Sequence, residues 1–98
     1  MRRDFIDKFK EISAYIRQHS TQNEVNFVKE LNTMVFVTIP KRPFSFQEFK
    51  HKPTVAKVYR RALLKKKWNI IYKVESTRIV FIFIYHSSQN VNRLKISD

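Results

Sequence analysis

Hydrophobic residues recur at helical spacing through the first third of the chain. Phe5, Phe9, Ile12 and Ile16 fall four, three and four residues apart, which places them on one face of an α-helix. A second group with the same period follows: Phe27, Val28, Leu31, Met34 and Val35. The pattern therefore predicts two amphipathic helices within residues 4–38.

The junction between the two predicted helices is very short. The first helix is expected to end around residues 18–20. Thr21 and Glu24 then match a capping box, in which the threonine hydroxyl accepts an unpaired backbone N–H and the glutamate reaches back. Such a short connection forces the helices into an antiparallel hairpin. The second helix is expected to end within residues 36–39, because Pro40 disfavours helical backbone in the residue before it.

Residues 40–54 are expected to form a loop. They contain the chain's three prolines and the phenylalanines Phe44, Phe46 and Phe49. Two roles for these rings stay open. They either pin the loop onto the core or form an aromatic patch that faces a partner.

From residue 55 the hydrophobic period changes from 3.6 to 2, which is typical of strands. Strands are predicted within residues 55–64, 68–74 and 79–86, with turns at 65–67 and 75–78. Connections this short imply antiparallel pairing. The last strand is hydrophobic on both faces, which predicts a central position in the sheet. The polar tail, residues 87–98, favours no single structure.

Taken together, these elements predict one α+β domain over residues 1–98. An N-terminal antiparallel helix hairpin packs on a three- to four-stranded antiparallel sheet. A chain of 98 residues holds one modest core. Because the chain has no glycine, its turns must rely on Asn, Ser, Lys and Pro.

Charge and composition narrow the function classes. Twenty Lys and Arg residues against eight Asp and Glu give a net charge of +12, which attracts polyanions such as nucleic acid, an acidic protein or an anionic membrane surface. The absence of cysteine excludes thiolate sites, and the three histidines lack metal-ligand spacing. Neither a metal nor another cofactor is expected. No signal peptide or membrane-spanning run is evident, so we expect a cytoplasmic protein without membrane contact.

Three stretches near the C-terminus occur in a recognisable order: 59–63 (YRRAL), 68–74 (WNIIYKV) and 79–86 (IVFIFIYH). Together with the helix hairpin they resemble the RelE/ParE superfamily of type II toxins, over most of residues 5–95. Members commonly carry an arginine in the first of these strands and a histidine after the last. Two departures stand out: no strand precedes the first helix, and Ser87 and Ser88 replace the arginine that often follows the histidine.

The resemblance implies the toxin of a toxin–antitoxin pair, neutralised by a small acidic antitoxin. Such a toxin inhibits growth by binding a target such as DNA gyrase. The alternative is cleavage of mRNA on the ribosome, and a third reading is a basic nucleic-acid-binding domain or an inactive homologue. The missing arginine favours binding over cleavage. Assembly as a homodimer or as a toxin–antitoxin hetero-oligomer is left open.

For a nuclease, the resemblance assigns Arg60 and Arg61 to the phosphate and His86 to acid or base catalysis without a metal. Since the two arginines alternate in a strand, only one of them lines a given face. Trp68 and Tyr72 either stack on a base or pack in the core. The residues expected to contact nucleic acid or antitoxin are Lys65, Lys66, Lys67, Lys73, Gln89 and Asn90. These assignments require a cationic face on the sheet.

Overall fold

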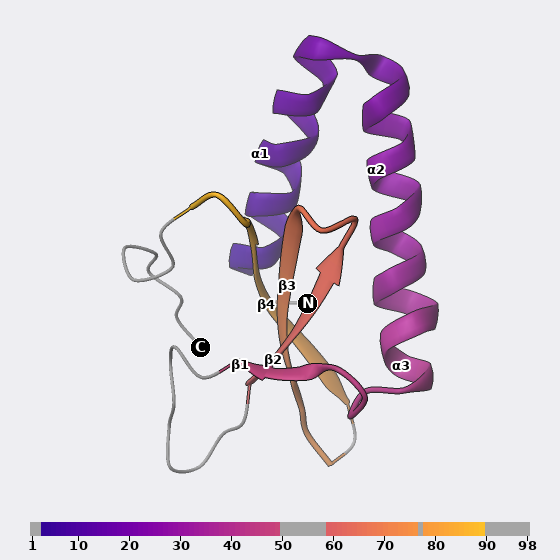
Figure 1. Cartoon of the computed structure of the whole chain (residues 1–98), viewed down its shortest axis with the longest axis vertical. Helices are drawn as coiled ribbons and strands as arrows, with labels where there is room; N and C mark the ends of the chain where they lie inside the picture. The colour runs from indigo at the N-terminus through magenta and orange to yellow at the C-terminus, as the bar shows by residue number, and fades with distance from the viewer. Residues whose placement is uncertain (1–2, 50–58, 77, 90–98) are drawn as a thin grey trace.

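A computed structural model describes residues 3–49, 59–76 and 78–89. The helical elements are α1 (Arg3–His19), α2 (Thr21–Thr33), a π-helical segment (Met34–Thr38) and α3 (Ile39–Lys41). The strands are β1 (Gln47–Phe49), β2 (Tyr59–Leu64), β3 (Trp68–Val74) and β4 (Ile79–His86). The helix hairpin lies against one face of the sheet and extends beyond the β2–β3 turn (Figure 1). Within the described ranges, no helix combines the length and hydrophobicity needed to cross a bilayer.

The two long helices are joined through a single residue. Ser20 is the N-cap of α2, and its hydroxyl accepts a hydrogen bond from the Asn23 N–H at 3.2 Å. The predicted cap at Thr21 is therefore wrong by one residue. Glu24 does not complete a capping box; its carboxylate instead pairs with Arg17 of α1 at 2.7 Å. This ion pair raises the pKa of Arg17 through hydrogen bonding and charge attraction and links the helices beside their turn.

The helical backbone continues further than the proline predicted. It runs through the π-helical segment and α3 to Lys41, with Ile39 in right-handed helical geometry directly before Pro40. In the π-helical turn the Ile39 N–H donates to the Met34 carbonyl, five residues back. Pro40 has no N–H to donate, so a helix reaching it already loses one regular bond. The π-turn shifts the hydrogen-bond register just before that loss.

The sheet is antiparallel with the order β1-β2-β3-β4. Its first strand, β1, lies inside the region predicted to be loop. Only three residues pair there, from Gln47 opposite Arg61 to Phe49 opposite Tyr59, so the segment is too short for a hydrophobic period. Within the described residues β4 is an edge strand, and its predicted central position is not found there. It is hydrophobic on both faces because α1 covers one face and a second apolar cluster forms on the other.

The helix-side core combines one stripe from each helix with one face of the sheet. The residues predicted to form these stripes and faces do so, which confirms the α+β class and the antiparallel sheet. A bulge at Ile82 of β4 shifts the alternation, so that Phe81 and Ile84 both face the helices. The buried helix-side core comprises Phe5, Ile12, Phe27, Leu31, Val35, Ile39, Ala62, Leu64, Ile70, Tyr72, Phe81 and Ile84. On the opposite face, Phe49, Tyr59, Ile71, Val80, Ile82 and Tyr85 are buried.

Two of the three loop phenylalanines take the structural role that the sequence analysis considered, and the third is exposed. Phe49 is buried, and Phe46 packs on the core with its ring edge against Tyr72. Phe44 is 67% exposed, and the guanidinium of Arg60 lies over its ring. Two of the rings therefore pin the loop to the domain, while the third remains at the surface.

Candidate functional site

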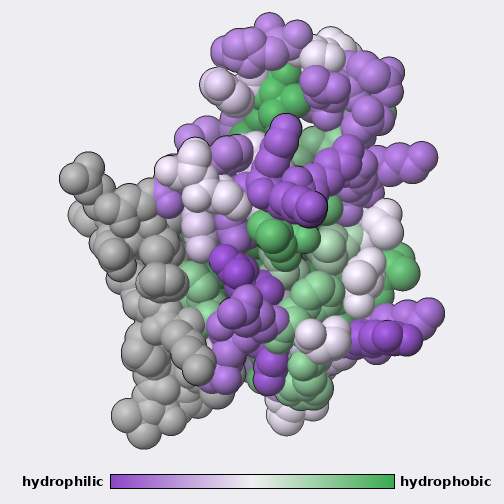
Figure 2. Space-filling view, viewed as in Figure 1, coloured by the Kyte–Doolittle hydropathy of each residue, from purple (hydrophilic) through white to green (hydrophobic). Residues whose placement is uncertain are grey.

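A cavity of about 940 Å³ opens between the helix hairpin, the β2–β3 turn and the end of β4. Its wall combines side chains of both charges with amides and aromatic rings. In Figure 2, hydrophilic side chains gather around the helix tips and the turn, with hydrophobic surface showing between the helices. The lining includes Lys8, Glu11, Tyr15, Asn26, Phe27, Glu30, Lys65, Lys67, Trp68, His86, Ser88 and Gln89.

The β2–β3 turn brings lysines to the cavity through unusual backbone. The Lys67 N–H donates to the Leu64 carbonyl at 3.1 Å, within the three-residue connection between the paired Leu64 and Trp68. Lys65 and Lys66 both have positive φ, 51° and 59°, the left-handed region that favours glycine. Each residue with a Cβ costs about 1 kcal/mol there. Two lysines therefore occupy positions where other residues would be more stable.

The lysines of the turn differ in their partners. Lys65 pairs through its ammonium group with the Glu30 Oε1 of α2 at 2.7 Å, which ties the turn to the helix. Lys67 also lines the cavity, yet its ammonium group makes no ion pair or hydrogen bond with any described residue. Lys66 belongs to the turn but not to the cavity wall. Lys8 on the same wall pairs with Glu11 at 3.5 Å, so of the three lysines that line the cavity only Lys67 lacks a partner among the described residues.

Glu30 also presents an unused acceptor. Its Oε1 receives Lys65, while its Oε2 is buried and has no hydrogen-bond partner within the described part of the chain. A buried carboxylate oxygen without a donor is costly. Other atoms of Glu30 line the cavity, because Oε2 itself is shielded from solvent.

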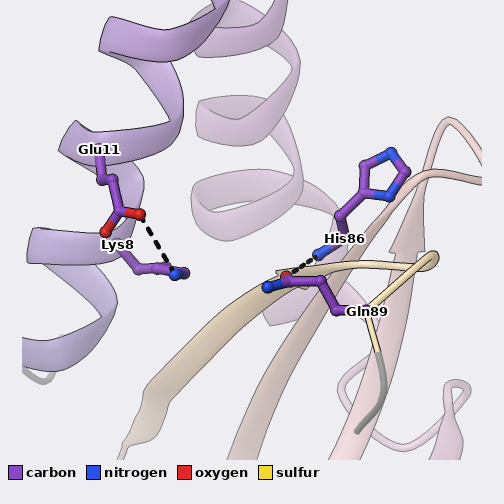
Figure 3. A network of polar contacts seen from close by, with 4 residues as sticks. All are labelled: Lys8, Glu11, His86 and Gln89. Carbon is purple, nitrogen blue, oxygen red and sulfur yellow. Dashed lines mark hydrogen bonds and ion pairs between the residues drawn. The ribbon is translucent and has the colours of Figure 1, made fainter. Parts of the chain in front are cut away.

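His86 closes the cavity at the end of β4, and its hydrogen bonds define its tautomer. The Ser88 backbone N–H donates to His86 Nδ1 at 3.0 Å, and the Ser88 hydroxyl lies 2.7 Å from the same atom. Because a backbone N–H only donates, Nδ1 is the acceptor and Nε2 of the neutral ring carries the proton. Figure 3 shows Gln89 folded back so that its Oε1 accepts the His86 N–H, at 3.0 Å, while Lys8 extends from α1.

Trp68 packs in the core and also reaches the cavity. Its ring packs 5.6 Å from Phe27 in the helix-side core and meets His86 edge-on at 4.8 Å. It is half-buried and also lines the cavity. The cavity therefore has an aromatic wall next to its lysines.

Arg60 and Tyr72 lie towards the other end of the same sheet face, where both side chains donate hydrogen bonds to carbonyls of the loop. Arg60 Nη1 donates to the Phe46 carbonyl at 2.8 Å and to the Phe44 carbonyl at 3.4 Å. The Tyr72 hydroxyl donates to the Pro43 carbonyl at 2.6 Å. Burial raises the pKa of Tyr72 to about 12, although the charge of Arg60 acts in the opposite direction. Tyr72 is thus a core residue.

The remaining cations of the sheet lie on the face opposite the helices. Arg61 is half-buried there and donates to the Gln47 side chain at 3.0 Å. Lys73 is buried and pairs with Glu75 at 3.2 Å. Arg78 binds the same carboxylate at 2.6 Å, and Arg78 and then Lys73 lower the pKa of Glu75 by hydrogen bonding. This face is mainly a buried apolar cluster, so the expected cationic face is not found there.

Four of the predicted site residues come together in one cavity: His86, Lys65, Lys67 and Gln89. Lys66 lies beside them in the turn, whereas Arg60, Arg61 and Lys73 lie elsewhere. The last predicted residue, Asn90, is outside the described residues. Sequence reasoning missed Glu30, because nothing in a helical period distinguishes a cavity-lining glutamate from a solvated one. Within the described residues, no cluster of histidine and carboxylate side chains is suited to holding a metal ion.

Comparisons of the chain with protein-family models, with curated proteins and with solved structures find no match.

Proposed function

We propose that the chain is the toxin of a toxin–antitoxin pair, that it inhibits growth by binding its target, and that an acidic antitoxin neutralises it. The motif order that resembles RelE/ParE toxins supports this, together with a helix hairpin on an antiparallel sheet. The net charge of +12 favours fast capture of an acidic partner.

The observation that carries binding over cleavage is the dispersal of Arg60, Arg61 and His86. His86 pairs with Trp68, and Trp68 pairs with Leu64, four residues along β2 from Arg60. At about 3.3 Å per residue this separation is roughly 13 Å. Arg61 faces the other side of the sheet, and Arg60 is bound to loop carbonyls. In the tautomer set by Ser88, His86 can donate but not accept a proton at Nε2.

The second candidate is cleavage of mRNA on the ribosome. One observation favours it: His86 shares a cavity with Lys65 and Lys67, so a phosphate, a cation and an acid group could meet there. DNA gyrase as the bound target rests on the resemblance alone.

Expression of the chain in growing bacteria tests the proposal. We expect growth arrest that persists in Arg61→Ala and His86→Gln, with gyrase–DNA complexes accumulating if gyrase is the target. Co-expression of a small acidic partner protein should relieve the arrest. If expression arrests growth and cuts mRNA, and if His86→Gln abolishes both effects, the chain acts as a nuclease instead. Normal growth with a folded, soluble chain would contradict both candidates.

A further inference from the structure

We propose that the cavity between the helix hairpin and the β2–β3 turn binds a nucleoside phosphate, either as a free nucleotide or as one unit of a single strand. This inference stands whether or not the chain inhibits growth, because it rests on the cavity alone. A volume of about 940 Å³ lies within the range of small-ligand sites.

Two groups in the cavity fit a phosphate. Lys67 has an ammonium group without a partner among the described residues, and His86 carries its proton on Nε2. An ammonium and an imidazole N–H are both good donors to phosphate oxygens. The backbone at Lys65 and Lys66 adopts strained positive φ to hold this lysine turn at the cavity. Strain of this kind concentrates at binding sites.

Two other groups fit a base. Trp68 and Phe27 form an aromatic wall, and a stacked base adds about 1–3 kcal/mol to binding in single-strand sites. Glu30 lines the cavity beside them, and a carboxylate accepts hydrogen bonds from the N–H groups on the edge of a base. Together, these residues complement a ligand in which a ring with N–H donors lies next to an anionic group.

An acidic peptide fits the same cavity less well. Glu11 and Glu30 both line it, and their negative charges would repel further carboxylates. Lys8 and Lys65 are already paired with Glu11 and Glu30, at 3.5 Å and 2.7 Å. The uncompensated positive charge inside the cavity is therefore small, and recognition must come from the mixture of donors, acceptor and rings.

Fluorescence of the purified full-length chain tests this directly, because Trp68 is its only tryptophan. Adenosine monophosphate and a short oligoadenylate are titrated beside an abasic sugar–phosphate oligomer of equal length and polyglutamate. We expect quenching by the base-bearing ligands, with at least tenfold weaker effects from the other two. Quenching by the monophosphate identifies a free nucleotide, and quenching by the oligomer alone identifies a strand. Equal quenching by the abasic oligomer or by polyglutamate, or no quenching at all, would overturn the proposal.

Two lysines of the same turn provide a matched pair of variants. Lys67→Gln should weaken binding about five- to tenfold, because it removes a charge-assisted contact to phosphate. Lys66→Gln removes the same charge outside the cavity wall and should change binding less than twofold at moderate salt. Equal losses in both variants would show that only net charge matters, and the proposed site would be wrong.

Glu30→Gln tests the base contact. It keeps the shape of the side chain but replaces one carboxylate acceptor with an amide N–H, so binding of adenosine monophosphate should fall about fivefold or more. Circular dichroism confirms that the variant is folded. Unchanged nucleotide affinity in the folded variant would count against contact between Glu30 and a base.

Discussion

The two ends of the helix-facing side of the sheet carry similar residue types but use them differently. At one end, which we call the closed end, Arg60 and Tyr72 bind the carbonyls of Phe44, Phe46 and Pro43. At the other, which we call the open end, the β2–β3 turn, Trp68 and His86 border a cavity in which the ammonium group of Lys67 has no partner among the described residues.

The comparison shows that a residue type does not reveal its role. Arginine and tyrosine are common in phosphate-binding sites, yet at the closed end they hold a loop against the sheet. A loop with few backbone partners needs side-chain donors for its carbonyls, and Arg60 and Tyr72 supply them. The lysines of the open end lie in a three-residue turn that closes its own backbone hydrogen bond, so their side chains are left for other contacts.

The largest expected effect on stability comes from a substitution at the closed end. Arg60→Ala removes the donors to the Phe44 and Phe46 carbonyls and the cation over the Phe44 ring. We expect the free energy of unfolding to fall by about 2–3 kcal/mol, measured by urea denaturation. Arg61→Ala is the matched control and should cost less than about 1 kcal/mol, because its contact with Gln47 is exposed. Equal losses would mean that Arg60 does not have this special role.

A smaller expected effect at the closed end is a change of folding stability with pH. The pKa of Tyr72 is about 12 in the folded chain, whereas it is about 10 in an unfolded one. Between these values the unfolded state releases a proton that the folded state keeps, so stability falls as pH rises. The fall from pH 10 to 12 should be on the order of 2 kcal/mol.

The matched variant for this pH effect is Tyr72→Phe. It should lose the Tyr72 contribution, so that the stability difference between the two proteins narrows or reverses as pH rises through that window. Because both proteins contain the same lysines, the titration of these lysines cancels in the difference between the two stabilities. Parallel stability curves of the two proteins from pH 10 to 12 would contradict the assignment.

The smallest expected effect concerns the turn at the open end. Lys66→Gly relieves a positive φ of 59° and should raise the free energy of unfolding by about 1 kcal/mol. Lys66→Gln keeps a Cβ and should leave stability within about 0.5 kcal/mol of the parent. Thermal denaturation measures both. If glycine gives no gain, the turn is not strained, and one support for the open end as a binding site is lost.

Local pattern predicted the helices and the longer strands because each buries one periodic face. The stripe from Phe5 to Ile16 packs on the core, and Trp68, Ile70, Tyr72 and Val74 share the helix side of β3. The incorrect local predictions arose where neighbouring residues, or alternative backbone hydrogen-bond patterns, compete for the same role. Ser20 rather than Thr21 caps α2, and the π-helical segment lets helical backbone reach Pro40. Strand β1 escaped detection because three residues carry no period.

The candidate site was only partly accessible from the sequence. The turn lysines and His86 stood out by type and position, and the antiparallel pairing of β2, β3 and β4 brings their ends together. Glu30 did not stand out, because it joins the cavity only through the packing of α2 over the turn. Arg60 was assigned to phosphate, since nothing in the sequence shows where the loop carbonyls lie.

Sequence by itself determined what depends on neighbours along the chain: the helix hairpin, the alternation of Arg60 and Arg61 between two faces, and the large positive charge. Tertiary structure alone decided which polar groups find partners. That outcome depends on contacts between segments far apart in the chain, such as Tyr72 with Pro43 and Lys65 with Glu30. Whether a side chain finds a partner distinguishes an arginine with a structural role from a lysine without a partner among the described residues. No local sequence pattern encodes this difference.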